Sequence, residues 1–252
     1  MKNYHTHTTR CYHAIDSEED YILAAIQSGY TELGFSDHTP WRYDSAFHST
    51  MRMEESQLED YVYTLRKLRE KYQDQISIKI GLECEYFPKY MAWLKETIEK
   101  YDIDYIILGN HYDDTDETGI YFGMPLTKQQ FKKYVDNCIK GIETGLYSYL
   151  AHPDLAHYDT QDSYYRQQMT RLCQCAKEHD LPLEFNLLGY STHRHYPSKD
   201  FFKIAKAVGN KVIIGTDAHE SSALLHMQVY HEAKAFLENL GIEITEEIQF
   251  FR

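Results

Sequence analysis

Met1-Lys-Asn-Tyr-His5-Thr-His7 opens the chain and carries two histidines two residues apart. The stretch reads as a short strand, residues 4–8, and side chains alternate across a strand, so His5 and His7 face the same way. Two neutral imidazole nitrogens on one face supply two of the ligands that a divalent transition metal requires. The chain contains 14 histidines, so this pair indicates a metal site only if other segments bring further ligands.

The rest of the chain alternates between short apolar strands and helices. Strands are expected at 4–8, 32–36, 76–83, 104–108, 148–151, 183–186 and 211–215, and helices at 17–28, 56–72, 89–100, 127–145, 163–179, 198–208 and 222–240. Residues 187–197 are expected to be a loop, and the tail from residue 242 has room for one more short strand. Strand–helix alternation predicts a parallel sheet.

Seven such units in 252 residues, with no Pro/Gly/Ser-rich linker between them, fit a single (β/α) barrel. We therefore predict an α/β fold with one domain, residues 1–252. An open doubly wound sheet is the alternative. The chain has neither GxGxxG nor GxxxxGK[ST], so the nucleotide-binding forms of that sheet gain no support.

Composition limits the function classes. The formal net charge of −13 argues against a surface that follows nucleic-acid phosphates. No apolar stretch approaches the roughly 18 residues that span a membrane, and no signal-peptide pattern opens the chain, so we expect a cytoplasmic protein. The five cysteines include no CxxC pair, which indicates neither a disulfide framework nor a zinc knuckle.

Residues of the types that bind metals follow six of the seven expected strands. In a parallel barrel the functional groups sit at the carboxyl ends of the strands, so these residues are expected to meet at one rim. They are His5, His7 and His13 with the first strand, Asp37 and His38 with the second, Glu83 and Glu85 with the third, His111 with the fourth, His152 with the fifth, and Asp217 and His219 with the seventh. The sixth strand offers only Asn186, which would orient a ligand or contact substrate.

Each of these residues has an ordinary alternative role. His38, His111 and His152, taken singly, could be loop or core histidines, and Asp217 could cap a helix. These alternatives do not explain why the residues fall at equivalent points of successive units. The mixed set of imidazoles and carboxylates favours Zn, Mn or Fe over Ca or Mg, and is too large for one ion.

The ordered motifs resemble those of the PHP superfamily (polymerase and histidinol phosphatase). The resemblance runs from residue 5 to residue 219 and implies a distorted (β/α)7 barrel with three divalent metal ions. One ion would be held by His5, His7, Glu83 and Asp217, a second by Glu83, His111 and His152, and the third by His13, His38 and His219. The matching segments are His5-Thr-His7, His13, Ser36-Asp37-His38, Gly81-Leu-Glu83, Gly109-Asn-His111, Ala151-His-Pro-Asp154 and Gly215-Thr-Asp-Ala-His219.

Within the superfamily, the chain length and the segment 186–197 look most like stand-alone histidinol-phosphate phosphatases. The resemblance implies that a bridging hydroxide attacks phosphorus while an arginine after the sixth strand, here Arg194, grips the phosphate. The expected reaction is hydrolysis of L-histidinol phosphate in histidine biosynthesis (EC 3.1.3.15), and the expected partner is this small substrate. Glu83, Asp217 and His219 are the expected catalytic residues, and Arg194, His157 and Asn186 the expected substrate contacts.

Two segments differ from the family pattern at positions where the substrate would bind. The chain reads Leu155-Ala-His157-Tyr158 where members often carry an arginine, and Asn186-Leu-Leu-Gly-Tyr190 where an Asn-Thr-Ser-Gly type of sequence is usual. His157, His193 or His195 are the candidates to compensate.

Other functions remain open on the sequence. A PHP-type phosphoesterase could act on another small ester, or on nucleotides or oligonucleotides, although the −13 charge opposes nucleic acid. Amidohydrolases also begin with HxH but usually present a lysine where this chain has Asn110-His111. A metal-storage or regulatory binding domain that kept the barrel is the non-enzymatic alternative, and the complete ligand set opposes it. The proton donor stays open among Asp16, Asp37 and Asp154, and so do the native metals and the oligomeric state.

Overall fold

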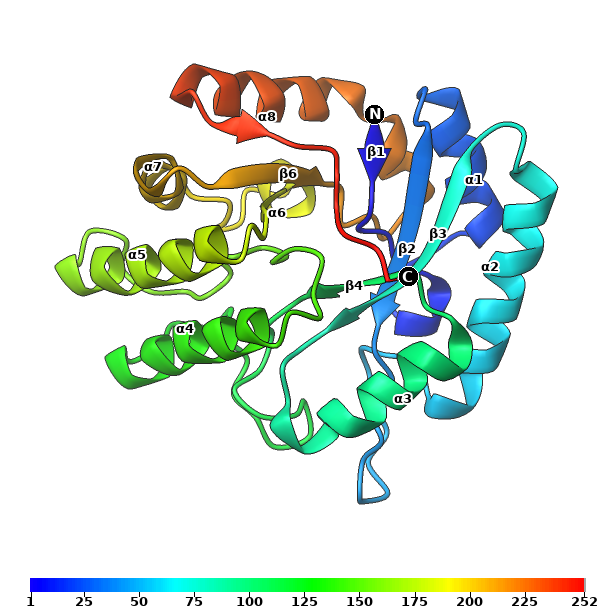
Figure 1. The fold of residues 1–252 in the computed structure, drawn as a ribbon, viewed down its shortest axis with the longest axis horizontal. Helices are drawn as coiled ribbons and strands as arrows, with labels where there is room; N and C mark the ends of the chain where they lie inside the picture. Colours follow the sequence, from blue (N-terminus) through cyan, green and yellow to red (C-terminus); the bar gives the residue numbers. More distant parts are fainter. Residues whose placement is uncertain (252) are drawn as a thin grey trace. The chain divides into compact units, whose positions relative to one another are not determined.

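The computed structural model describes residues 1–251. They form two compact units (Figure 1). The first unit comprises Met1–Ile106, Thr216–Met227 and the C-terminal residues from Gln249, and the second comprises Ile107–Gly215 and Gln228–Ile248. That residues 1–252 are one domain stays a prediction.

The first unit is built on a sheet whose strand order is β1-β2-β3-β4. Strand β2 pairs in parallel with both β1 and β3, which is the predicted arrangement. Helices α1 and α2 run along β2 and β3 (Figure 1). The elements are β1 (Lys2–Asn3), η1 (Thr9–Cys11), α1 (Glu18–Gln27), β2 (Glu32–His38), η2 (Glu55–Gln57), α2 (Leu58–Tyr72), β3 (Ser77–Cys84), η3 (Pro88–Tyr90), α3 (Met91–Tyr101), β4 (Tyr105–Leu108) and η4 (Ser221–Leu225).

A buried tyrosine fills part of the interior of this unit. Tyr105 is fully buried, and its hydroxyl donates to the carbonyl oxygens of Tyr4, at 2.8 Å, and Phe35, at 3.2 Å. Its ring lies against Gly34 and Gly81, where a Cβ atom would collide with it. Glycine at these two strand positions therefore allows the tyrosine to fill the interior and to tie the first two strands together.

The second unit contains β5 (Leu183–Asn186), β6 (Lys211–Gly215) and β7 (Glu243–Ile244), which pair in parallel in that order. Helices α4, α5 and α7 pack side by side (Figure 1). Strand β7 is the extra short strand for which the tail left room. The helices are α4 (Lys128–Glu143), α5 (Ser163–Glu178), α6 (Leu187–Ser191), α7 (Lys199–Val208) and α8 (Met227–Leu240).

Three local predictions were wrong in this part of the chain. Residues 148–151 do not form a regular strand, because only Leu150 makes parallel bridges, to Leu108 and Leu183. The predicted loop 187–197 begins with α6, which Asn186 caps by accepting a hydrogen bond from the Gly189 amide at 2.8 Å. The predicted helix 222–240 is divided at residue 226, whose backbone is not helical, into η4 and α8.

Among the described residues, no helix combines the length and the apolar character that crossing a membrane requires.

Candidate metal centre

In the first unit, backbone pairing places the His-x-His motif, residues 5–7, beside the Asp-x-His motif, residues 217–219. Segments 5–7 and 217–219 are joined by a parallel bridge between Thr6 and Ala218. Beside this bridge, the His7 amide donates to the Ala218 carbonyl at 2.9 Å, and the Ala218 amide donates to the His5 carbonyl at 3.1 Å. The predicted first strand is shorter than expected, because β1 covers only Lys2–Asn3, but residues 5–7 still run alongside their neighbour. The His-x-His and Asp-x-His motifs therefore come together although more than 200 residues separate them.

The pairing of β2 with β3 adds the next two groups. His38 is the register partner of Glu83 at the ends of these strands. Its Nδ1 atom lies 3.0 Å from Glu83 Oε2. Both residues are buried. The strand register thus brings the imidazole of one sequence motif next to the carboxylate of another.

One carboxylate oxygen of Asp217 faces three imidazoles. Asp217 Oδ1 lies 3.4 Å from His5 Nε2, 3.2 Å from His7 Nε2 and 3.4 Å from His219 Nδ1. These separations exceed an ordinary hydrogen bond of about 2.9 Å. They match the edge of about 3.3 Å between two ligands of a tetrahedral zinc ion with bonds near 2.0–2.1 Å. The spacings to His5 and His7 therefore fit ligands arranged around a cation, whereas His219 turns Nδ1 toward the Asp217 carbonyl and would offer Nε2.

Glu83 lies at a similar distance from the Nε2 atoms of the same two histidines. Its Oε2 atom is 3.6 Å from His5 Nε2 and 3.6 Å from His7 Nε2. The rings of His5 and His7 are 5.2 Å apart, so they face the same groups as predicted. One oxygen near His5, His7 and His38 is the placement that a carboxylate bridging two ions would need.

The histidine tautomers also suit metal binding. His13 Nδ1 lies 2.7 Å from the Cys11 carbonyl oxygen, and His219 Nδ1 lies 3.0 Å from the Asp217 carbonyl oxygen. Each ring N–H then donates to a carbonyl, which leaves Nε2 as the unprotonated atom, as in many metal-binding histidines. Within residues 1–251, the buried Nε2 atoms of His7 and His219 have no hydrogen-bond partner. The donor set thus fits divalent metal ions.

Asp37 forms hydrogen bonds that hold neighbouring residues of the cluster in position. Its carboxylate accepts hydrogen bonds from the backbone amides of Thr8, at 3.2 Å, and His38, at 2.8 Å, and from the Thr8 hydroxyl. It also lies 3.4 Å from His7 Nδ1. Burial alone would raise the pKa of Asp37, but His7 and Thr8 hold that pKa below its ordinary value. Of the three aspartates that the sequence left open, Asp37 is thus the one placed to orient a histidine in this cluster.

The charges in the cluster are strongly coupled. Burial by itself would lower the pKa of His7, yet the neighbouring carboxylates of Asp217 and Asp37 raise it well above the ordinary value. Burial would likewise raise the pKa of Asp217, but His5, His7 and His219 hold it well below the usual range. The buried carboxylate therefore stays ionised and demands positive charge, which protons on histidine or a metal ion can supply.

The other two aspartates lie elsewhere. Asp16 is exposed and accepts hydrogen bonds from the amide and the hydroxyl of Ser221, at 2.9 and 2.8 Å. Asp154, in the second unit, is buried and accepts the amide of Ser198 at 2.5 Å. Burial raises the pKa of Asp154 to about 7.

The second unit brings together a further predicted pair. The rings of His111 and His152 are 4.9 Å apart, and both side chains are buried. The backbone amide of His152 donates to Glu184 Oε2 at 2.9 Å, and the Asn186 side-chain amide donates to the same oxygen at 2.9 Å. Asn186 is therefore part of a buried network that orients the turn at His152, in addition to capping α6.

The remaining expected substrate contacts lie in the second unit too. His157 stacks on His195, with ring centroids 4.3 Å apart, and His195 Nε2 lies 2.6 Å from the Leu155 carbonyl oxygen. Arg194 is exposed, and its guanidinium donates to the Tyr196 hydroxyl at 2.7 Å. Two of the three candidate compensating histidines, His157 and His195, thus stack on each other.

Sequence reasoning missed the placement of Arg52 in the long loop after β2. Arg52 is 0% exposed and forms a double hydrogen bond to Glu85, with distances of 2.9 and 3.1 Å. The indole N–H of Trp41 donates to the same carboxylate at 2.8 Å. Glu85, a candidate ligand on sequence spacing, therefore anchors this loop to the end of β3. Nothing in the local sequence distinguishes Arg52 from the exposed Arg42 nearby.

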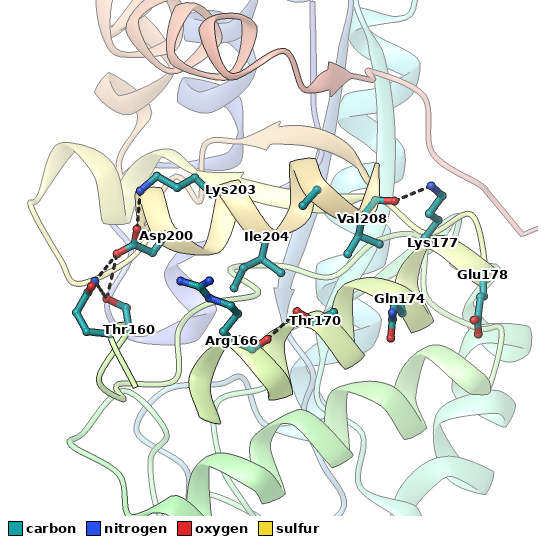
Figure 2. A pocket seen from close by; sticks show the side chains of 12 residues that line it. Thr160, Arg166, Thr170, Gln174, Lys177, Glu178, Asp200, Lys203, Ile204 and Val208 are labelled. Carbon is teal, nitrogen blue, oxygen red and sulfur yellow. Dashed lines mark hydrogen bonds and ion pairs between the residues drawn. The ribbon is translucent and has the colours of Figure 1, made fainter. Parts of the chain in front are cut away.

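A groove of about 880 Å³ lies between α5 and α7 in the second unit (Figure 2). Its polar side chains are largely satisfied by neighbours, since Lys203 pairs with Asp200 and Lys177 donates to the Val208 carbonyl. None of the predicted site residues lines it. The groove therefore gives no support to a second location for the predicted chemistry.

Comparisons with known proteins show the family to which the chain belongs. A family model described as the PHP domain matches residues 3–187. The "Probable histidinol-phosphatase" of Deinococcus radiodurans is 26% identical over 231 residues, which cover 86% of this chain and 85% of that protein. The histidinol-phosphatase of Bacillus subtilis is 26% identical over 140 residues, covering 53% of this chain and 52% of that protein.

Among solved structures, the histidinol phosphate phosphatase of Lactococcus lactis, complexed with zinc, L-histidinol and phosphate, matches with a TM-score of 0.75. The match covers 100% of this chain and 98% of that one at 17% identity, which shows a shared fold. It confirms the predicted α/β fold class of the PHP type. Because the family model matches well over half of the chain, the protein belongs to the PHP family.

Proposed function

We propose that this protein is a metal-dependent phosphomonoesterase that hydrolyses L-histidinol phosphate to L-histidinol and phosphate. The observation that carries the proposal is the convergence in the first unit of imidazoles and carboxylates, most of them buried, at ligand spacing. The histidinol-phosphatase names of the relatives support the choice of substrate. The converging residues are His5, His7, His13, His38, Glu83, Asp217 and His219.

The donor set suits three divalent ions, with Zn, Mn or Fe as the candidates. His5, His7, Glu83 and Asp217 would hold one ion, His13, His38 and His219 another, and the His111–His152 pair a further one. Bound there, such ions lower the pKa of water and neutralise charge on a phosphoryl group. The chain itself holds Asp217 ionised, keeps His13 and His219 in the tautomer that leaves Nε2 unprotonated, and fixes His7 through Asp37.

Phosphate release is the direct test of this proposal. The protein, supplied with Zn or Mn, is expected to release inorganic phosphate from L-histidinol phosphate at a higher kcat/KM than from generic phosphomonoesters. Release from other esters but not from histidinol phosphate would move the substrate assignment within the family. Cleavage of single-stranded oligonucleotides at physiological salt, with no phosphomonoesterase activity, would replace the proposal with a nuclease.

Arg194 is proposed to grip the phosphate. Arg194→Ala is expected to raise KM for the ester by about 30-fold, which corresponds to about 2 kcal/mol for one charge-assisted contact. Steady-state kinetics give the answer. Arg166→Ala, which removes an exposed arginine from α5, serves as the matched control and should leave both constants unchanged. If KM and kcat of the Arg194 variant equal those of the wild type, another group binds the phosphate.

Removal of metal should destabilise the first unit as well as stop turnover. Without cations, the buried cluster can balance Asp217 and Glu83 only by protonating histidines, and ligands that bind only the folded state add to its stability. We expect dialysis against a chelator to lower the melting temperature and abolish activity, and Zn or Mn to restore both. Equal melting temperatures with and without chelator would show that the cluster does not hold metal.

A further inference from the structure

Cys11 lies in the turn that follows the first ligand motif and is fully buried. This turn is η1, and the Cys11 amide closes it by donating to the Thr8 carbonyl at 3.1 Å. Tyr12 then adopts a positive φ of 66°. This reversal brings His13 back so that its Nδ1 lies 2.7 Å from the Cys11 carbonyl. The local geometry therefore presents a thiol and an imidazole together from a Cys-x-His segment.

The thiol is close to ligand atoms from two other segments. The ligand atoms of Cys11, His13 and His219 all lie within 4.8 Å of one another, and so do those of Cys11, His7 and Asp37. His13 and His219 each use Nδ1 on a backbone carbonyl, which leaves Nε2 to accept. Independently, the Nε2 atom of His219 is buried with no hydrogen-bond partner in the described part of the chain.

We propose that the Cys11 thiolate is a ligand of the ion held by His13 and His219, which makes this position a mixed sulfur–nitrogen site. The inference rests on the proposed metal-dependent function and adds a residue that spacing alone did not assign. On binding, the Sγ–metal bond forms as the thiol proton passes to solvent. A thiolate with imidazoles is a common ligand set for tetrahedral zinc.

The proposal gives the positions of the cluster different metal preferences. Thiolate ligands select zinc, whereas carboxylates such as Glu83 and Asp217 are equally suited to manganese. A protein exposed to excess Mn should therefore retain zinc at the Cys11 position. In Cys11→Ser the hydroxyl is a poorer zinc ligand, so zinc affinity there should fall by about 100-fold or more, the upper range for disturbed metal sites.

Cobalt provides a readout that does not depend on activity. We expect the metal-free full chain, titrated with Co²⁺, to develop the near-ultraviolet absorption of sulfur-to-cobalt charge transfer. Cys11→Ser should lose this band while still binding cobalt at the other positions. Cys175→Ser is the matched control, because Cys175 lies in α5 in the second unit at 9% exposure, and it should keep the band.

The outcomes separate this inference from the proposed function. Cobalt binding and phosphatase activity without any charge-transfer band in the wild type would refute the sulfur ligand and leave the function standing. A band that persists in Cys11→Ser would also refute it. Failure of the wild type to bind any divalent metal would overturn both. Because the wild-type spectrum alone can refute the proposal, it stays testable even if Cys11→Ser does not fold.

Discussion

Asp217→Asn is expected to lower kcat/KM for the phosphate ester by about 1000-fold or more, since a metal ion supplies several kcal/mol and each 1.36 kcal/mol is a factor of ten. Asp217 Oδ1 faces three imidazole nitrogens at 3.2–3.4 Å. An amide there carries no charge and is a weak ligand. Metal content per chain, measured by elemental analysis beside the kinetics, should fall by at least one ion.

Asparagine is chosen so that the backbone survives the change. Asp217 has a positive φ of 53°, a conformation that Asn tolerates better than Ala. Asp102→Asn is the matched control, because Asp102 also has a positive φ, 47°, while its carboxylate is 96% exposed. The control should keep full activity and metal. Activity within tenfold of the wild type in Asp217→Asn would show that this carboxylate is not a metal ligand.

Arg52→Met is expected to destabilise the protein by about 3–5 kcal/mol, the usual cost of leaving a buried charge without its partner. Arg52 and Glu85 are both almost inaccessible, at 0% and 1% exposure, and their carboxylate–guanidinium contact is double. Loss of the arginine removes the double hydrogen bond to Glu85 and keeps the one from the Trp41 indole N–H. Urea unfolding measures the change in the free energy of unfolding.

Two further variants separate charge from packing in this prediction. Arg42→Ala removes an arginine whose pair with Glu55 is exposed, at 59% and 41%, so it should leave the free energy of unfolding almost unchanged. Arg52→Met combined with Glu85→Gln removes the buried charge while keeping an acceptor for Trp41. The double variant should be more stable than Arg52→Met alone. If it is not, lost packing rather than an unpaired charge accounts for the effect.

The placement of Glu85 illustrates where reasoning from spacing reached its limit. Glu83 and Glu85 follow the same strand two residues apart, and spacing alone makes both candidates. In the structure Glu83 lies at the histidine cluster, while Glu85 binds an arginine from a loop 33 residues earlier. The loop has no periodic pattern, so the sequence contains no signal that one of its arginines turns inward.

The fifth strand shows a different limit. Residues 148–151 are buried, and the three after Ser148 are hydrophobic, as the prediction required, but only Leu150 forms parallel bridges. Apolar character predicts burial, whereas regular strand pairing depends on how neighbouring segments align, which is a tertiary property.

By itself, the sequence determined the alternation of strands and helices, the parallel pairing and the identity of the ligand motifs, because hydrophobic periodicity and strand-end positions are local properties. Tertiary structure decided which residues meet. The bridge between Thr6 and Ala218 and the register of His38 with Glu83 align distant motifs, and the reversal at Tyr12 brings His13 beside Cys11. Such contacts depend on register and loop geometry, whose energies come from segments far away in the chain.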